Sequence, residues 1–177
     1  MKIFKEVRKL NKLANLKSIT LKGYVNLVGR PSEILHSEEY GDFIEIILPG
    51  AFEKALLLAE DVDLIFNHRE SRKMGSIKQG NVELYEDNLG LHIKCTLTDP
   101  LVIKQAENGE LRGWSFEFKP YRQHWITGND GIKRRFVRDL SLKSVSLAGI
   151  GQTPAYKDTS VKISATPYNS LDIIGEK

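Results

Sequence analysis

One serine in an alternating aromatic stretch is the first residue of this sequence whose type and setting could do chemistry. The stretch Leu111-Arg-Gly-Trp-Ser-Phe-Glu-Phe-Lys119 alternates aromatic residues with Gly113, Ser115, Glu117 and Lys119. A period of two places the aromatic side chains on one face of a strand and Ser115 on the other. Such a strand would present the serine hydroxyl rigidly. An ordinary amphipathic strand has the same pattern, so both interpretations stay open on these residues alone.

A serine nucleophile needs a neighbouring base, because a free hydroxyl is almost wholly protonated at neutral pH. The sequence offers four histidines, and we interpret His36, His92 and His124 as surface or structural residues. His68 differs because it follows the apolar strand expected over residues 62–66. Catalytic groups concentrate where a rigid strand opens onto a loop. The residues by themselves therefore indicate a β-rich domain with a possible Ser115/His68 pair.

Other common site chemistries lack their patterns in this sequence. The histidines show no paired metal-ligand spacing, and Cys95 alone cannot build a zinc site. There is no Gly-x-Ser-x-Gly elbow, phosphate-binding loop or dinucleotide fingerprint. We therefore expect no cofactor and no metal. Cys95 shares a strand face with Leu91, Ile93 and Leu97, so we interpret it as a small buried hydrophobe, and a lone cysteine fits a reducing compartment.

Length and charge favour one domain with a basic N-terminal arm. The chain has 177 residues and a net charge of +3, with seven Lys/Arg and one acid in residues 1–22. That segment is therefore +6 and the remainder is −3, which does not favour a nucleic-acid-binding core. No apolar run approaches the roughly 18 residues of a membrane span, and a secretory signal is not expected. We divide the chain into an arm (1–17), a domain (18–160) and a loosely ordered tail (161–177).

The hydrophobic pattern predicts many short strands and a few helices. Helices are expected over 2–15, 49–60 and 99–107, the last beginning at Asp99-Pro100. A polar loop is expected over 30–41, and strands 74–78, 82–86 and 89–97 read as an antiparallel meander. Further strands are expected over 19–28, 43–48, 62–66, 113–119, 121–126, 132–139 and 140–148. The predicted fold class is mainly β with flanking helices (α+β), as an antiparallel β-barrel or curled sheet.

Several blocks taken together resemble the caudovirus prohead serine proteases, the capsid-maturation proteases of tailed phages, over roughly residues 20–160. These proteases are similar in fold and mechanism to the herpesvirus assemblins. The blocks are specific jointly rather than singly. In chain order they are Gly23-Tyr-Val-Asn26, Glu45-Ile-Ile-Leu-Pro-Gly-Ala-Phe52, Val62-Asp-Leu-Ile-Phe-Asn-His68, Met74-Gly75, Glu86-Asp-Asn-Leu-Gly-Leu91, Leu111-Arg-Gly-Trp-Ser-Phe-Glu-Phe118, Leu140-Ser-Leu-Lys-Ser-Val-Ser-Leu147 and Pro154-Ala-Tyr156.

The resemblance implies a nucleophile at Ser115 and a general base at His68. It places the third catalytic member at Ser144, where the family commonly has an acidic residue. A hydroxyl can hold the imidazole tautomer but cannot stabilise imidazolium as a carboxylate does, and losing the orienting acid can cost on the order of 10⁴ in rate. Asp139, Glu117 and Ser146 are the possible substitutes. The glycines of residues 148–151 either expose oxyanion-binding N–H groups or form a plain turn.

The resemblance implies a serine endopeptidase that processes scaffold and capsid precursor proteins during phage prohead maturation. Its partners would be the major capsid protein and the scaffold precursor, with a possible homodimer and no membrane. It would act in the host bacterial cytoplasm, inside assembling proheads, and the arm and tail would serve packaging or self-cleavage. Two alternatives stay open. One is a catalytically inactive capsid-assembly protein on the same fold, and the other is DNA binding through the basic arm.

Overall fold

The computed structural model describes residues 18–156 and 159–165 of the chain. Within these residues it contains ten strands and two helices. The strands are β1 (Ile19–Leu27), β2 (Leu35–Ser37), β3 (Gly41–Ile47), β4 (Asp63–Phe66), β5 (Arg69–Ser76), β6 (Val82–Glu86), β7 (Gly90–Leu97), β8 (Gly113–Thr127), β9 (Lys133–Ala148) and β10 (Lys162–Ala165). The helices are α2 (Ala51–Leu58) and α3 (Pro100–Glu107). The prediction of a mainly β protein with flanking helices is confirmed.

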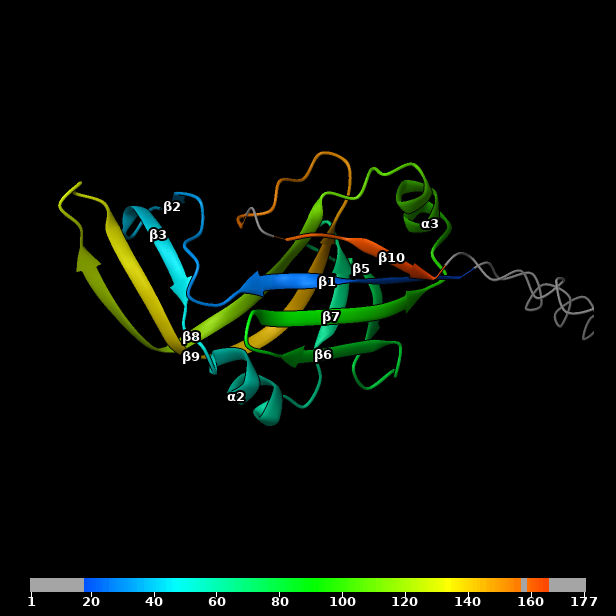
Figure 1. Ribbon diagram of the computed structural model, residues 1–177, viewed down its shortest axis with the longest axis horizontal. Helices are drawn as coiled ribbons and strands as arrows, with labels where there is room; N and C mark the ends of the chain where they lie inside the picture. Colours follow the sequence, from blue (N-terminus) through cyan, green and yellow to red (C-terminus); the bar gives the residue numbers. More distant parts are fainter. Residues whose placement is uncertain (1–17, 157–158, 166–177) are drawn as a thin grey trace, which may run out of the picture.

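The strands form two sheets that share one hydrophobic core. The first sheet has the order β10-β1-β7-β6 and is antiparallel throughout. The second is organised around β9, which pairs along its whole length with β8. On its other edge β9 pairs in parallel first with β3 and then with β4. Strands β2 and β5 complete this sheet, and the long β8–β9 hairpin extends away from the first sheet (Figure 1).

The aromatic alternation of β8 faces the core as the period of two predicts. Trp114 is fully buried, and Phe116 and Phe118 pack against the buried cluster. Phe116 also makes an edge-to-face contact with Phe52 of α2, at a ring separation of 5.2 Å. Ser115 therefore points to the opposite face of the sheet, where it is half-buried.

Helix α3 begins where the sequence predicts, whereas α2 begins at Ala51, two residues after the predicted start at Pro49. Each helix has a carboxylate at its N-terminus. Asp99 accepts hydrogen bonds from the N–H groups of Leu101 and Val102, with Pro100 in the first turn of α3. The start of α2 lacks a local capping side chain, and Glu86 of β6 supplies the acceptor from outside. Its carboxylate binds the N–H of Gly50 at 2.6 Å and that of Glu53 at 2.7 Å. Helix N-termini favour such an anion because their first N–H groups have no partner within the helix.

The predicted antiparallel barrel is wrong in two respects. The sheets are not closed into a barrel. The second sheet is also mixed, because β9 runs parallel to both β3 and β4. A parallel pair joins strands far apart in the sequence and leaves no hairpin signal, so local patterns could not reveal it. The resemblance to the herpesvirus protease fold stays an expectation.

Three local assignments also change. The strand expected over 74–78 begins earlier, because β5 starts at Arg69, and it pairs with β4 rather than joining a meander with β6 and β7. Strands β8 and β9 are each continuous where two shorter strands were expected, with β-bulges at the expected breaks. The short strand β2 lies within the expected loop 30–41. Bulges keep a long strand paired while its sequence pattern loses phase, which explains the broken periodicity.

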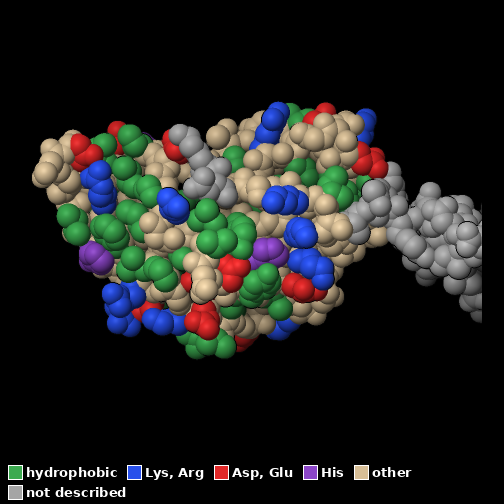
Figure 2. All heavy atoms as spheres, in the orientation of Figure 1, with side chains coloured by type: hydrophobic (Ala, Val, Ile, Leu, Met, Phe, Trp, Pro, Cys, Tyr) green, Lys and Arg blue, Asp and Glu red, His purple; other side chains and the backbone are tan. Residues whose placement is uncertain are grey.

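The expected helix over 2–15 and the basic arm over 1–17 lie outside the described residues. Within the predicted tail, β10 pairs with β1, while the division into arm, domain and tail stays a prediction. No helix in the described part of the chain is long and apolar enough to cross a bilayer. Figure 2 shows basic and acidic side chains intermixed on the face in view, with hydrophobic side chains gathered over the far end of the β8–β9 hairpin.

Candidate active site

The candidate site lies along the C-terminal half of β9, which is paired on both edges. Ser146 of β9 is in register with Ser115 on β8 and with Ile65 on β4. Residues directly opposite one another in a sheet share a face. The side chains of Ser115, Ser146 and Ile65 therefore lie in one row across three strands, on the face opposite Trp114.

His68 lies in a two-residue turn between β4 and β5 rather than in an open loop. Phe66 pairs with Arg69, and the intervening Asn67 and His68 have φ angles of 53° and 55°. Positive φ at both central positions is what a type I′ hairpin turn requires, and Asn and His tolerate it better than most residues. The turn gives His68 a fixed backbone conformation with an exposed side chain.

Three hydrogen bonds attach this turn to the end of β9. The N–H of Asn67 donates to the carbonyl of Leu147 at 3.0 Å, and the N–H of His68 donates to Ser146 Oγ at 2.9 Å. Asn67 Oδ1 accepts from the N–H of Gly149 at 2.7 Å. Ser146 thus connects both candidate residues, since its backbone is paired with Ser115 and its hydroxyl holds the backbone of His68.

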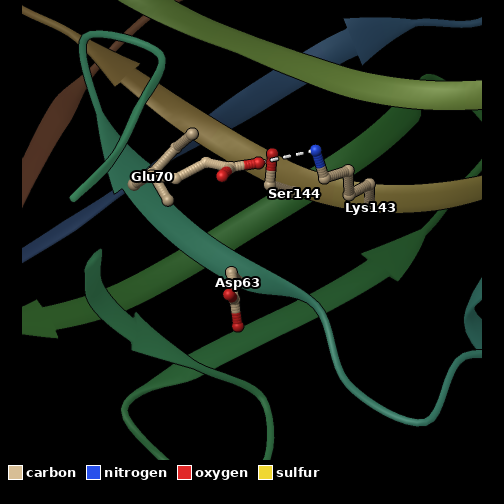
Figure 3. A pocket seen from close by; sticks show the side chains of 5 residues that line it. Asp63, Glu70, Lys143 and Ser144 are labelled. Carbon is tan, nitrogen blue, oxygen red and sulfur yellow. Dashed lines mark hydrogen bonds and ion pairs between the residues drawn. The ribbon is translucent and has the colours of Figure 1, made fainter. Parts of the chain in front are cut away.

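Ser144, the residue at the expected third position, has a different environment. Ser144 is 4% exposed, and its Oγ has no hydrogen-bond partner among the described residues. The residue lines a pocket of about 290 Å³ together with Asp63, Ile65, Glu70 and Lys143 (Figure 3). Ser144 Oγ therefore holds no imidazole in this structure.

Three charged residues of this pocket, Asp63, Glu70 and Lys143, were not singled out from the sequence. Lys143 lies in a β-bulge of β9, because Glu117 pairs with Ser144 while Phe118 pairs with Leu142. The bulge turns its ammonium towards the charged pocket, where it binds Glu70 at 2.7 Å and Glu117 at 2.9 Å. The ammonium holds the pKa of Glu70 below its usual range, and the two carboxylates raise the pKa of Lys143.

The available sequence signal for Glu70 was its spacing from the candidate pair, a spacing that Glu117 shares. Glu70 follows His68 by two residues, and Glu117 follows Ser115 by two residues. Each therefore comes from the element that carries one candidate catalytic residue. Only the tertiary structure shows that Lys143 joins them, because a bulge cannot be located from periodicity alone.

Asp139 does not join the candidate site. It lies seven residues from Ser146 along β9, about 23 Å at the rise of a strand. Its carboxylate pairs with Lys54 at 3.1 Å and with Arg122 at 2.6 Å. These cations lower the pKa of Asp139, the Lys54 hydrogen bond most strongly.

The first two N–H groups of the turn after β9 donate hydrogen bonds to side chains of the protein. The N–H of Gly149 donates to Asn67 Oδ1, and that of Ile150 donates to Gln105 Oε1 at 3.3 Å. A Cβ on Gly149 would approach Gln105 Oε1 to 2.3 Å and the Phe66 ring to 2.6 Å, so this position requires glycine. Both N–H groups already have acceptors, which favours the plain-turn interpretation over an oxyanion site at these two residues.

The other histidines lie in structural settings. His36 pairs with Asp42 at 2.7 Å on the surface, and His124 stacks on Phe136 at a ring separation of 4.8 Å. His92 stacks on Tyr85, and burial lowers the pKa of its imidazole.

Cys95 and the acidic side chains that the structure describes form no metal centre. Cys95 is buried, and desolvation raises the pKa of its thiol to about 12, which fits a small core residue. Among the described residues, no group of three or more His, Cys, Asp or Glu side chains could hold a metal ion.

A serine on one strand and a histidine on a rigid hairpin turn, both attached to a third strand, define a candidate serine hydrolase of mainly β architecture. A family model described as caudovirus prohead serine protease matches residues 5–172. The chain therefore belongs to the caudovirus prohead serine protease family, which confirms the resemblance carried by the sequence blocks. A comparison with curated proteins finds no match. Family membership supports a protease role in bacteriophage capsid maturation.

Proposed function

We propose that this protein is a serine endopeptidase that processes scaffold and capsid precursor chains in assembling proheads. The observation that carries the proposal is the placement of Ser115 and His68 around Ser146. Ser115 is in register with that residue, and the backbone of His68 is hydrogen-bonded to its hydroxyl. Family membership supplies the reaction class, and the shared anchor supports these two residues as its active pair.

In the proposed reaction, Ser115 Oγ attacks the carbonyl carbon of the scissile peptide bond while His68 takes the hydroxyl proton. The resulting tetrahedral intermediate collapses as His68 returns this proton to the leaving amine, which gives the acyl-enzyme on Ser115. Water then attacks the ester with His68 again as base, and the proton returns to Ser115 as the acid product leaves. The rigid turn and strand favour this chemistry because they hold the pair in fixed positions.

Ser144 remains the proposed third member by its position in the family pattern. Its unpaired hydroxyl is available to a partner, whereas the Ser146 hydroxyl is engaged by the backbone of His68. Glu117 is bound to Lys143 and 48% exposed, so it fits a role at the pocket better than one behind the imidazole. A hydroxyl in the third place predicts slower turnover than a carboxylate would give.

The proposed substrates and partners are the major capsid protein and the scaffold precursor. The proposed place of action is the prohead interior in the host cytoplasm, with a homodimer as a possible state. A self-cleavage site in residues 1–17 or 161–177 would accompany this role.

Co-expression with the cognate capsid precursor tests the proposal. Wild-type protein should shorten the precursor, and Ser115→Ala and His68→Ala should each abolish the shortening. His124→Ala is the matched control, since His124 lies nine residues from Ser115 on the same strand and is stacked on Phe136. Normal processing by both site variants would refute the assignment of the pair.

The second candidate function is a catalytically inactive assembly protein on the same fold. The observation that favours it is the serine at residue 144, which lacks both a carboxylate and a hydrogen-bond partner. A fluorophosphonate probe separates the two functions, because it labels an activated serine. Labelling of Ser115 that is lost in His68→Ala is expected of the protease, whereas an unlabelled wild-type protein would favour the assembly role.

A further inference from the structure

The charged pocket beside the candidate active site is positioned to receive part of a substrate. Its residue Ser144 lies two positions from Ser146 on β9, on the same face and about 7 Å along the strand. Glu117, in register with Ser144, lies two positions from Ser115 on β8. A polypeptide bound across Ser115 would therefore have a neighbouring side chain within reach of this pocket.

The size and floor of the pocket suit one extended side chain. Its volume of about 290 Å³ is at the lower end of the ~300–1,000 Å³ typical of small-molecule sites. Ile65, which is 3% exposed, supplies an apolar surface for the methylene groups of such a side chain.

The charges around the pocket favour a cation. Asp63 and Glu70 line the pocket, and Glu117 lies beside it, paired with the lining residue Lys143. These three carboxylates face two ammonium groups, those of Lys143 and Lys73, where Lys73 is paired with Asp63 at 2.6 Å. The local balance is one negative charge. An acidic side chain would add to that excess, whereas an ammonium or guanidinium group would neutralise it.

Lys143 already shows how a cation binds here. Its ammonium binds the carboxylates of both Glu70 and Glu117. Figure 3 shows the contact between Lys143 and Glu70 passing close to the Ser144 hydroxyl in that view. The Lys143 side chain is 55% exposed, so it can move aside at small cost and share these carboxylates with a second cation. The raised pKa of Lys143 is consistent with a position that stabilises positive charge.

We propose that the pocket lined by Asp63, Ile65, Glu70, Lys143 and Ser144 is a substrate subsite for a basic side chain, lysine or arginine, close to the scissile bond. The proposal rests on the proposed protease function. It assigns to Glu70 and Glu117 a role in specificity rather than in the chemical step.

Peptide turnover gives the first test. Digestion of a proteome-derived peptide library by wild-type protein should show lysine or arginine enriched at one fixed position near the cut. Matched peptides that carry lysine, norleucine or glutamate at that position then separate the effect of side-chain charge on kcat/KM from that of the apolar part of the side chain. Glu70→Gln should lower kcat/KM for the lysine peptide about 2- to 5-fold, as expected for an exposed charge pair, and leave the norleucine peptide unchanged.

Lys143→Met should act in the opposite direction and raise the preference for lysine, because it removes a competing cation. Glu83→Gln is the matched control, since Glu83 pairs with Lys94 on the first sheet and should change no preference. Enrichment of acidic residues, or an equal effect of Glu70→Gln on all three peptides, would overturn the subsite.

Binding to the inactive Ser115→Ala variant gives a test that needs no turnover. The lysine peptide should shift the backbone amide resonances of Ile65, Glu70 and Ser144 more than the norleucine peptide does. Equal shifts from the two peptides would refute the subsite whether or not cleavage occurs. Conversely, absence of cleavage by wild-type protein with selective lysine binding would refute the protease function and leave the cation site supported.

Discussion

Two buried serines on one strand provide a matched test of the candidate site. Ser144 and Ser146 share a face of β9 and are 4% and 0% exposed. Ser146 Oγ accepts the N–H of His68 at 2.9 Å, whereas Ser144 Oγ has no partner. Replacing each with alanine removes the same atom from a buried position on the same face of β9. The difference between the two variants therefore reports the hydrogen bond to the His68 turn.

The expected sizes follow from what each hydroxyl does. Losing a hydrogen bond costs ~0.5–1.5 kcal/mol when water can replace the acceptor, and more when the donor stays buried. Because His68 lies in an exposed turn, Ser146→Ala should lower the free energy of unfolding by about 1 kcal/mol. Ser144→Ala removes a buried hydroxyl without a partner, so its free energy of unfolding should be unchanged or raised by up to about 1 kcal/mol.

Urea unfolding measures both changes in the free energy of unfolding, and the comparison holds when the variants share the wild-type m-value. The same proteins should be assayed for peptide cleavage, because Ser146→Ala removes the one of the three hydrogen bonds that holds the backbone of His68 itself. A displacement of about 1 Å there can cost on the order of 10² in kcat/KM. If Ser144 orients the imidazole, Ser144→Ala should lose activity without losing stability. Equal destabilisation by the two substitutions, or a larger loss for Ser144→Ala, would refute the role assigned to Ser146.

Three further predictions concern the frame around the site. Gly23→Ala should destabilise the protein by at least about 2 kcal/mol in urea unfolding, because its Cβ would lie 1.8 Å from the carbonyl oxygen of Ser160. Tyr156→Phe should cost about 1–3 kcal/mol in the same assay, since the Tyr156 hydroxyl donates to the buried Glu45 at 2.8 Å. Burial raises the Cys95 pKa from 9.0 to about 12, so its contribution to stability should be complete below pH 9 and be lost as the pH rises towards 12.

Each of these predictions has a control within the chain. Gly80→Ala, where a Cβ meets nothing within 4 Å, should cost only the 1–2 kcal/mol or so of a left-handed backbone. Tyr85→Phe should be near neutral because Tyr85 is 49% exposed. Cys95→Val should reduce the fall in the free energy of unfolding between pH 9 and 12. An unchanged pH profile in that variant would contradict the effect assigned to the thiol.

The sequence predicted the local parts of the site well. The aromatic alternation placed Trp114 in the core and Ser115 on the opposite face, because a strand has a side-chain period of two. Asp99 and Pro100 correctly marked the start of α3. His68 was correctly placed at the end of a strand, but residues 69–73 were left outside the expected strands because β5 is polar and mostly exposed. A polar strand held by pairing on one edge carries little hydrophobic signal.

The residues around the candidate pair depended on contacts that the sequence does not display. Lys143 appeared to be an ordinary exposed residue of a strand until the bulge in β9 turned it towards Glu70 and Glu117. Asp139 remained a possible third member until the register placed it about 23 Å away along β9. Ser146, considered only as a substitute for the third member, instead holds the backbone of His68.

The sequence by itself determined the family, the two helices, and the strand faces that carry Ser115 and bury Trp114. These features depend on short-range periodicity, helix-capping residues and ordered motifs, each of which is defined by residues close together in the sequence. The tertiary structure decided that β9 lies between β8, which carries Ser115, and β4, which leads into the turn carrying His68. That arrangement depends on parallel pairing between segments about 80 residues apart, whose stability comes from burial and hydrogen bonding on both edges of β9.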